Sequence, residues 1–202
     1  MNLEMAHQLN VIMDIFKNYP TKIFINQDVF CLQHNLIKNK KEHIEKLKQF
    51  RNLFNYFFVD TKKTTTDMTS KFLNNISNNN NHLMYCIFYK KKLIGQYGMK
   101  YSGKKRISLD NAIRFSSLGG KKIFNIIEKK LLNLIVKNNF GYNIIIMVNK
   151  KNLAAINMHK KFKFKDAKYV CNVTDLLTYI KHTSKKPEDY FIKAIKATKR
   201  FK

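Results

Sequence analysis

Cysteine is scarce in this sequence, and long hydrophobic runs are missing. The chain has 202 residues and three cysteines, and Cys31, Cys86 and Cys171 lie far apart without a CxxC pair. So few thiols, odd in number, suit a reducing compartment better than a disulfide-bonded scaffold. No uninterrupted apolar stretch approaches the roughly 18 residues that span a bilayer. The first apolar segment contains Glu4 and Asp14 and lacks a cleavage site of small residues, so we expect no secretory signal and a cytoplasmic protein.

Acidic residues and arginine are scarce as well. The chain has 13 Asp and Glu against 39 Lys and Arg, which gives a net charge of +26. Such a charge attracts phosphate on nucleic acid, anionic lipid, a nucleotide-sugar or a cofactor. However, nucleic-acid readers favour arginine, and the only arginines are Arg51, Arg106, Arg114 and Arg200. Two interpretations stay open: a compositional background from AT-biased coding, which the stretch "NNISNNNNH" also suggests, and a phosphate-seeking surface.

What the sequence does contain is the pattern of a folded α/β protein. A hydrophobic content of 45% is typical of a chain with a core. Apolar residues at helical spacing predict helices over residues 3–17, 40–52, 68–76 and 121–138, and a further one from Asn152. Alternating or continuous apolar runs predict extended segments over 21–32, Leu83–Tyr89, Leu93–Tyr101, Arg106–Phe115, Tyr142–Val148 and Lys165–Val173.

This order predicts an α/β sandwich with a mixed sheet. The antiparallel meander over 83–115 leads through helix 121–138 to strand 142–148, which we expect to lie parallel to the meander's last strand. We divide the chain into an N-terminal helical extension (1–20), a central domain (21–173) and a C-terminal helix with a basic tail (174–202).

The stretch "IIIMVNKKNLAAINMHKKFKF" carries the most specific pattern. It resembles the strand, Asn-initiated helix and closing Gly-Phe of the Gcn5-related N-acetyltransferase (GNAT) superfamily. The matching positions are filled by Val148, Asn152, Ala155, His159 and Phe164. The resemblance covers about residues 20 to 173, and it implies the GNAT acyl-CoA N-acyltransferase fold, a mixed sheet flanked by helices, with acetyl-CoA as cosubstrate.

The preceding "SSLGGKKIFNIIEKKLL" resembles the loop and helix with which that family binds the pyrophosphate of acetyl-CoA. Free N–H groups and the dipole at a helix N-terminus favour such an anion, and adjacent glycines let the backbone approach it. We expect the cofactor to be bound by Leu118, Gly119, Gly120, Lys121, Lys122 and Ile123, with Asn152 along its pantetheine arm. Lys163 stands where the family has Gly, and a left-handed conformation there would cost about 1 kcal/mol.

His159 takes the place of the Tyr that the family uses to orient the cofactor sulfur and to protonate the departing thiolate. Imidazole can perform that proton transfer near neutral pH. A histidine among lysines on a helix is otherwise an ordinary solvated residue, and this interpretation stays open.

Two further segments point to the acceptor and the base. "NLAAINMHKKF" is similar to family members that acetylate nucleotide-linked amino sugars, and "FRN" at 50–52 resembles their acceptor-side helix end. This implies acceptor contacts for Arg51 and Asn52, although Arg51 could equally serve only the helix end. Asp110 is a candidate general base. Strand alternation would place it on one face with Arg114, as a possible ion pair, and Leu109 with Ile113 on the other.

We expect no metal, because no spacing among His7, His34, His43, His82 and His182 makes a metal site. The sequence therefore predicts an acetyl-CoA-dependent N-acetyltransferase, with catalytic His159 and Asp110 and with a primary amine of a nucleotide-linked amino sugar as acceptor. The alternatives are a ribosomal-protein or peptide N-acetyltransferase, and a non-catalytic, basic RNA-associated module on the same fold.

Overall fold

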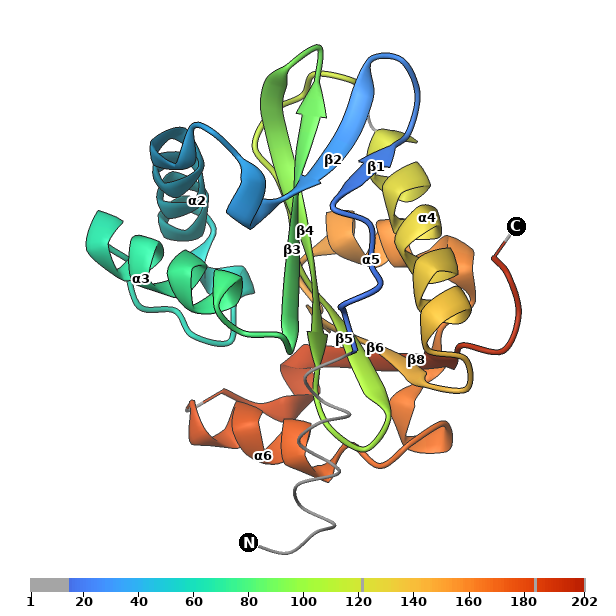
Figure 1. The fold of residues 1–202 in the computed structure, drawn as a ribbon. Coiled ribbons are helices and arrows are strands. Elements are labelled where there is room, and N and C mark those ends of the chain that lie inside the picture. Colours follow the sequence, from blue (N-terminus) through green and yellow to red (C-terminus); the bar gives the residue numbers. More distant parts are fainter. Residues whose placement is uncertain (1–14, 121, 184, 202) are drawn as a thin grey trace, which may run out of the picture.

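A mixed sheet runs through the middle of the molecule, with helices on both faces (Figure 1). The computed structural model describes residues 15–120, 122–183 and 185–201. The strands are β1 (Lys22–Phe24), β2 (Val29–Gln33), β3 (His82–Tyr89), β4 (Lys92–Tyr101), β5 (Arg106–Arg114), β6 (Asn143–Asn149), β7 (Lys165–Asp166) and β8 (Tyr190–Lys196). The helices are α2 (Lys40–Leu53), α3 (Thr66–Ser77), α4 (Lys122–Asn138), α5 (Leu153–His159) and α6 (Thr174–His182). Short 3-10 turns cover η1 (His34–Leu36), η2 (Asn55–Phe57), η3 (Lys160–Phe162), η4 (Ala167–Tyr169) and η5 (Pro187–Asp189).

The strand order is β1-β2-β3-β4-β5-β6-β8-β7. β1 to β5 form an antiparallel meander, β5 and β6 pair in parallel, and β8 pairs antiparallel with both β6 and β7. The predicted mixed sheet and its parallel crossover through the long helix are confirmed. Among the described residues, no helix combines the length and apolarity needed to cross a bilayer.

Two cores hold the layers together. On one face, the apolar stripe of α4 packs on the sheet, where Ile127, Leu131 and Ile135 are wholly buried against residues such as Ile107 and Ile144. On the other face, α2 and α3 cover the sheet through a smaller cluster that includes Leu47, Leu73, Met84 and Ile113. Each such aliphatic side chain contributes about 1.5–3 kcal/mol of burial free energy.

The C-terminal part differs from the sequence prediction. The helix from Thr174 is confirmed, but the predicted extended segment Lys165–Val173 is wrong beyond Asp166. There the Asp166 carboxylate accepts from the Lys168 N–H, and the N–H groups of Val170 and Cys171 donate to the Ala167 carbonyl, which closes a turn. The segment predicted as a basic tail also contributes β8, which lies inside the sheet between β6 and β7. Of the predicted helix 3–17, only residues 15–17 are described, and they lie in a turn.

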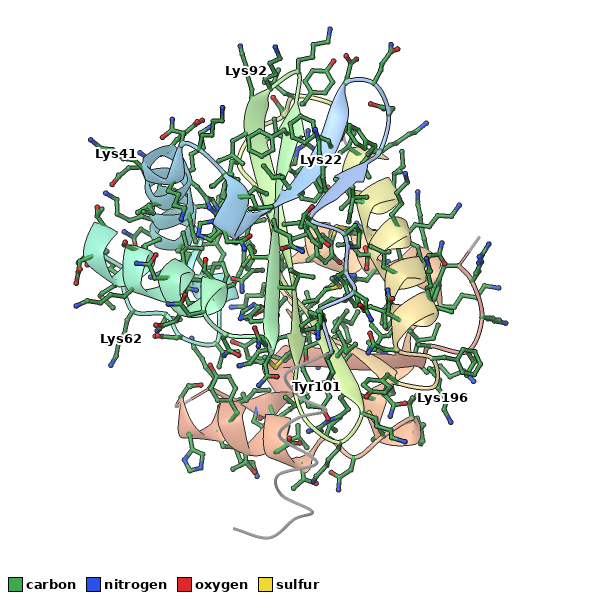
Figure 2. All side chains as sticks on the ribbon, in the orientation of Figure 1. Lys22, Lys41, Lys62, Lys92, Tyr101 and Lys196 are labelled. Atoms are coloured by element: carbon green, nitrogen blue, oxygen red, sulfur yellow. The ribbon has the colours of Figure 1, made fainter. Side chains whose placement is uncertain are left out.

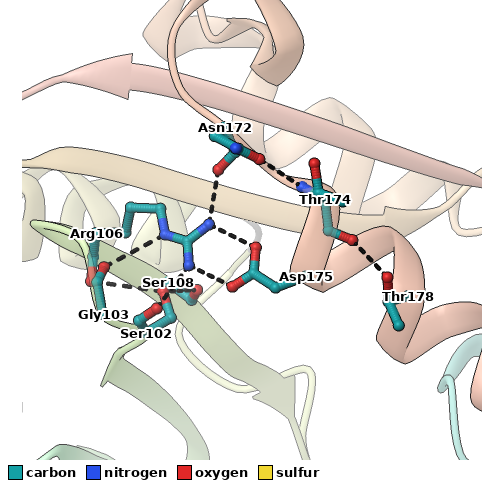
Figure 3. Close-up of polar contacts among 8 residues, drawn as sticks. All are labelled: Ser102, Gly103, Arg106, Ser108, Asn172, Thr174, Asp175 and Thr178. Carbon is teal, nitrogen blue, oxygen red and sulfur yellow. Dashed lines mark hydrogen bonds and ion pairs between the residues drawn. The ribbon is translucent and has the colours of Figure 1, made fainter.

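Arg106 fastens this C-terminal part to the start of β5 (Figure 3). The guanidinium is 2% exposed and donates to both carboxylate oxygens of Asp175 on α6. It also donates to three backbone carbonyls, those of Asn172, Ser102 and Gly103. Because every donor direction of the guanidinium is used, the buried charge is well compensated.

We predict that Asp175→Asn weakens the fold in a pH-dependent way. Hydrogen bonds from Arg106 lower the pKa of Asp175. A carboxyl whose pKa is lower in the folded state stabilises the fold above its unfolded pKa, and this contribution is lost as the pH falls through the folded value. Urea unfolding at pH 7 should show a loss of about 1–2 kcal/mol, and the difference from wild type should shrink below about pH 4. Asp166→Asn, at an exposed aspartate, is the control, and equal losses in the two variants would contradict the prediction.

Candidate active site

The parallel pairing of β5 and β6 stops halfway along the strands. The paired residues run from Arg106 opposite Asn143 to Leu109 opposite Ile146. Beyond this point β5 is hydrogen-bonded only to β4, and β6 only to β8, so the two strands no longer pair with each other. Between Leu109 and Arg114, the side of β5 that faces β6 therefore has backbone polar groups without a strand partner. A sheet that opens in this way offers a slot for an extended ligand.

A β-bulge accompanies the opening. Tyr97 of β4 lies opposite two residues of β5, because Gly98 pairs with Asp110 and Gln96 pairs with Ile113. Asn111 has a φ of 49° at this place. A bulge inserts one residue and bends the strand, so β5 turns away from β6 where the slot begins.

His159 and Glu128 form a buried pair beside the part of β6 that does not pair with β5. His159 ends α5 and is 7% exposed, and Glu128, on the apolar face of α4, is fully buried. The distance between His159 Nδ1 and Glu128 Oε1 is 2.5 Å. A neutral imidazole that donates from Nδ1 to the carboxylate has Nε2 as a proton acceptor, and the imidazolium donates from both nitrogens. His159 also lines a pocket of about 310 Å³ with Ile146 and Val148 of β6 and Phe164.

Tyr97 lies near the same carboxylate on the central strand β4. Burial raises the pKa of its hydroxyl, and the neighbouring Glu128 charge adds to the rise. Tyr97 therefore stays protonated at physiological pH, and the Glu128–His159 pair is the part of this cluster that can exchange a proton.

The loop before α4 has the geometry of an anion-binding turn. Arg114 donates to the carbonyls of Ser116 and Ser117 and so fixes them on one side of the loop. Gly119 and Gly120 both have positive φ, 78° and 79°. A Cβ at Gly119 would lie 2.3 Å from Ile123 Cδ1, whereas no atom lies within 4 Å of a Cβ at Gly120. A side chain at Gly119 would be strained by the positive φ and would displace the Ile123 methyl group, and Gly120 leaves open space in front of the α4 N-terminus, where free N–H groups favour an anion.

The helix that carries His159 begins and ends as its sequence predicts. Asn152 caps α5, because its Oδ1 accepts from the Ala155 N–H at 3.1 Å. Lys163, in the family's glycine position, has φ 56° and ψ 36°. The predicted left-handed conformation is therefore present with a lysine side chain, at a cost of about 1 kcal/mol.

The sequence and the fold were compared with those of known proteins. No protein-family model matches the sequence, and no curated protein matches it. Among solved structures, the microcin C7 self-immunity acetyltransferase MccE, in complex with acetyl-CoA and AMP, superposes with a TM-score of 0.64 at 14% identity, covering 88% of this chain and 97% of that one. The fold is that of the GNAT acetyltransferases.

Two further GNAT-fold structures support this assignment. The ribosomal L7/L12 α-N-protein acetyltransferase RimL, in complex with coenzyme A, has a TM-score of 0.59 at 14% identity, with 86% of this chain and 94% of that chain covered. The N-acetyltransferase PseH of Campylobacter jejuni has a TM-score of 0.54 at 10% identity, with 83% and 97% covered. The predicted GNAT-type fold is confirmed.

The structure places Asp110 differently from the alternation argument. Leu109 packs in the α4 core and Ile113 in the α2–α3 core, so these two residues face opposite sides of the sheet. The bulge at Asn111 shifts the alternation between them. Asp110 lies 3.4 Å from His82 Nε2 and not beside Arg114, whose donors are used in the loop. The expected Asp110–Arg114 pair is wrong. The role of Asp110 as base stays a prediction, at the first residue of β5 beyond the paired segment.

The predicted acceptor residues lie at the end of α2. The Arg51 guanidinium lies 4.6 Å from the ring centre of Phe58. Asn52 uses both ends of its amide on the backbone of Thr64, at 2.8 and 2.9 Å, so it holds the loop between α2 and α3. These contacts mean that Asn52 stabilises the loop after α2. Acceptor binding by either residue stays a prediction.

The loop after α2 reaches the far end of β6 and β8. The Asn149 amide lies 3.5 Å from the Tyr56 carbonyl, and the Tyr190 hydroxyl donates to the Phe58 carbonyl at 3.3 Å. An aromatic segment, residues 54–58, therefore borders the open end of the sheet, and Tyr56 is 50% exposed.

Sequence reasoning missed Glu128 and also a cluster of two histidines and a cysteine in the core. An acidic residue on the apolar stripe of the long helix, next to Ile127, was the available signal for Glu128. His34, His43 and Cys86 meet in the core through pairing of distant segments, which no local spacing reveals. Of the predicted cofactor residues, Leu118, Gly119, Gly120, Lys122 and Ile123 lie together at the α4 N-terminus, and Lys121 lies outside the described residues.

Proposed function

We propose that this protein is an acetyl-CoA-dependent N-acetyltransferase. The observation that carries the proposal is the slot between β5 and β6, with the buried His159–Glu128 pair beside it and the Gly119–Gly120 turn at the α4 N-terminus. MccE and RimL, which share the fold, were solved with acetyl-CoA and coenzyme A, respectively. The residues of this chain fit the cosubstrate: the turn receives the pyrophosphate, and the slot receives the extended pantetheine arm.

Each part of the site then has a task in acetyl transfer. The amine nitrogen bonds to the thioester carbon, the C–S bond breaks, and the ammonium proton leaves to a base or to water. Unpaired N–H groups of β5 beyond Leu109 stabilise the carbonyl oxygen as it gains negative charge. His159 gives its Nε2 proton to the departing thiolate from the imidazolium form, which keeps the Nδ1 proton in the hydrogen bond to Glu128. The proton released by the ammonium restores this form.

The acceptor we favour is a primary amine on a nucleotide-linked amino sugar. The aromatic segment 54–58, with exposed Tyr56 and the nearby Arg51, offers a ring surface and a cation for a base and a phosphate. MccE, which shares the fold, was solved with AMP together with acetyl-CoA, and this favours a nucleotide-containing acceptor. The second candidate is a peptide or ribosomal-protein amine, which the likeness to RimL favours.

A basic RNA-binding module is the remaining candidate, and the distribution of charge disfavours it. The labelled lysines Lys22, Lys41, Lys62, Lys92 and Lys196 lie on several sides of the molecule (Figure 2). RNA-binding surfaces typically gather their basic residues on one face or stripe.

A mass-resolved acetylation assay tests the function. Purified protein and acetyl-CoA are incubated with nucleotide-linked amino sugars, peptides and tRNA, and products are identified by the mass of one added acetyl group. We expect the amino sugars to be acetylated. If only peptides are acetylated, the amino-sugar acceptor is refuted, whereas the N-acetyltransferase activity is supported. No product, no acetyl-CoA binding and tight RNA binding that weakens steeply with salt would establish the RNA-binding candidate.

We predict that Gly120→Val weakens acetyl-CoA binding without unfolding the protein. A β-branched residue at φ 79° is strained and fills the open space before α4. Gly103→Val is the matched control, because Gly103 also has positive φ, 75°, and no atoms within 4 Å of a Cβ, but lies in the β4–β5 turn. Both variants should lose at least about 1 kcal/mol of stability, and calorimetry should show weaker acetyl-CoA binding only for Gly120→Val. Equal affinity in the two folded variants would refute the phosphate site.

We predict that His159→Ala lowers turnover by about 10² to 10⁴, the range for a positioned proton donor, while acetyl-CoA binding is largely unchanged. Since alanine would leave the buried Glu128 carboxylate without its partner, His159→Gln, whose amide can still donate to it, is measured in parallel. His159→Tyr should recover part of the turnover, because a phenol can donate the same proton. His182→Ala, at an exposed histidine of α6, is the control. Normal turnover in a folded His159→Gln protein would remove His159 from the mechanism.

A further inference from the structure

A second polar cluster lies in the core, away from the acetyl-transfer site. His34 in η1, His43 in α2 and Cys86 in β3 come from three separate segments. They are 3%, 0% and 0% exposed, so all three are buried. Cys86 packs in the same small cluster as Ile37 and Leu93, beneath α2 and on the sheet face opposite α4.

The three side chains bring their ligand atoms together. His34 Nδ1 and His43 Nδ1 are 2.9 Å apart, and Cys86 Sγ lies over the His43 ring, 3.5 Å from Nδ1 and 3.8 Å from Nε2. One ligand atom from each residue lies within 4.8 Å of the others. Tetrahedral zinc, with bonds of about 2.05 Å to nitrogen and about 2.3 Å to sulfur, separates two nitrogens by about 3.3 Å and nitrogen from sulfur by about 3.6 Å. The two nitrogens reach this value after a shift of a few tenths of an ångström, and Cys86 Sγ reaches it when the side chain turns about its Cα–Cβ bond from above the His43 ring toward Nδ1.

Gln96 orients His43 for this arrangement. Its Oε1 lies 2.6 Å from His43 Nε2, and the whole side chain is buried. When Nε2–H donates to this oxygen, the lone pair of His43 is on Nδ1, the nitrogen that lies 2.9 Å from His34 Nδ1. A metal-bound histidine typically donates its other N–H to such an oxygen. Gln96 Nε2 has no hydrogen-bond partner in the described part of the chain, so the contact with His43 is the main polar interaction of this buried amide.

Hydrogen bonds leave the thiol as the weakest member of the cluster. His34 Nδ1–H can donate to His43 Nδ1 and His43 Nε2–H to Gln96, after which no lone pair of His43 remains for the Cys86 thiol. His34 also lines a depression of about 490 Å³, so one side of the cluster borders a hollow.

We infer that His34, His43 and Cys86 form a zinc site, with His34 Nδ1, His43 Nδ1 and Cys86 Sγ as the three protein ligands. Zinc displaces the thiol proton of Cys86 on binding and ties η1, α2 and β3 together. The site plays no part in the acetyl-transfer chemistry proposed above. Its place at α2 gives it a structural role on the acceptor side, because α2 leads directly into the aromatic segment 54–58.

Metal titration of the full chain tests this inference. Chelator-treated protein is titrated with Zn²⁺ in competition with a chromophoric chelator, and with Co²⁺ in the absorption spectrometer. We expect one metal per chain, a thiolate-to-cobalt charge-transfer band, and the intense d–d bands of four-coordinate cobalt. Cys86→Ala should abolish the charge-transfer band and weaken Zn²⁺ binding by more than about 100-fold, because even residues that only orient a ligand cost 10–100-fold.

Cys31→Ala is the matched control, since Cys31 is equally buried, on the neighbouring strand β2. It should keep both the metal and the cobalt band, and Gln96→Leu should weaken binding by about 10–100-fold. If Cys86→Ala does not fold, X-ray absorption of the zinc-loaded wild type decides, with one sulfur at about 2.3 Å and nitrogens at about 2.0–2.1 Å expected. A shell without sulfur, no stoichiometric binding by the wild type, or full binding by folded Cys86→Ala would overturn the zinc site.

Discussion

The interrupted pairing of β5 and β6 is the constraint on which the site depends. At one end the strands are joined from Arg106 and Asn143 onward, and Arg106 is itself held by α6 and by three carbonyls. At the other end, the bulge at Asn111 bends β5 away and β8 continues the sheet on β6. A slot that is fixed at one end and bounded by continuous strands on both sides presents a stable row of backbone donors. Such preorganised donors need no rearrangement during the reaction, which is what makes them effective.

The same constraint explains why a carboxylate can be buried in the core of the α4 face. Glu128 would be costly among apolar side chains without a partner. α5 follows directly on the end of β6, so the opening of the sheet also determines where His159 meets Glu128. The pair is therefore a product of the strand topology, and either residue alone would be destabilising there.

Local patterns predicted most of the fold, and nonlocal contacts explain the rest. The meander, the long helix and the strand before Asn152 all carry an apolar period that matches their element, and they appear within a few residues of the predicted bounds.

β8 was missed because its run "YFIKAIK" mixes lysines into a strand whose neighbours lie far away in sequence. The bulge at Asn111 was invisible, since the alternation of "SLDNAIR" reads as a regular strand. His34, His43 and Cys86 meet only because β2 pairs with β3 and α2 packs over both. For the proposed acetyl-transfer site, the sequence pointed to the Gly pair and His159 as candidates, whereas Glu128 and the β5 opening needed the sheet.

Charge in this protein has two distinct roles that the net value of +26 conceals. Most of the described lysines are exposed, and those labelled in Figure 2 lie on several sides of the molecule. Solvated and screened charges of this kind suit a compositional origin. In the described part of the chain, three of the charged side chains away from open solvent have defined partners: Arg106 pairs with Asp175, Glu128 with His159, and Arg114 with two loop carbonyls. Arg106 and Arg114 lie at the two ends of β5. Pairing with β6 begins at Arg106, and the loop that leads to Gly119 and Gly120 begins after Arg114. Two of the four arginines thus fix the strand that forms one wall of the slot, and this use follows from the rigid fork of the guanidinium, which lysine cannot reproduce.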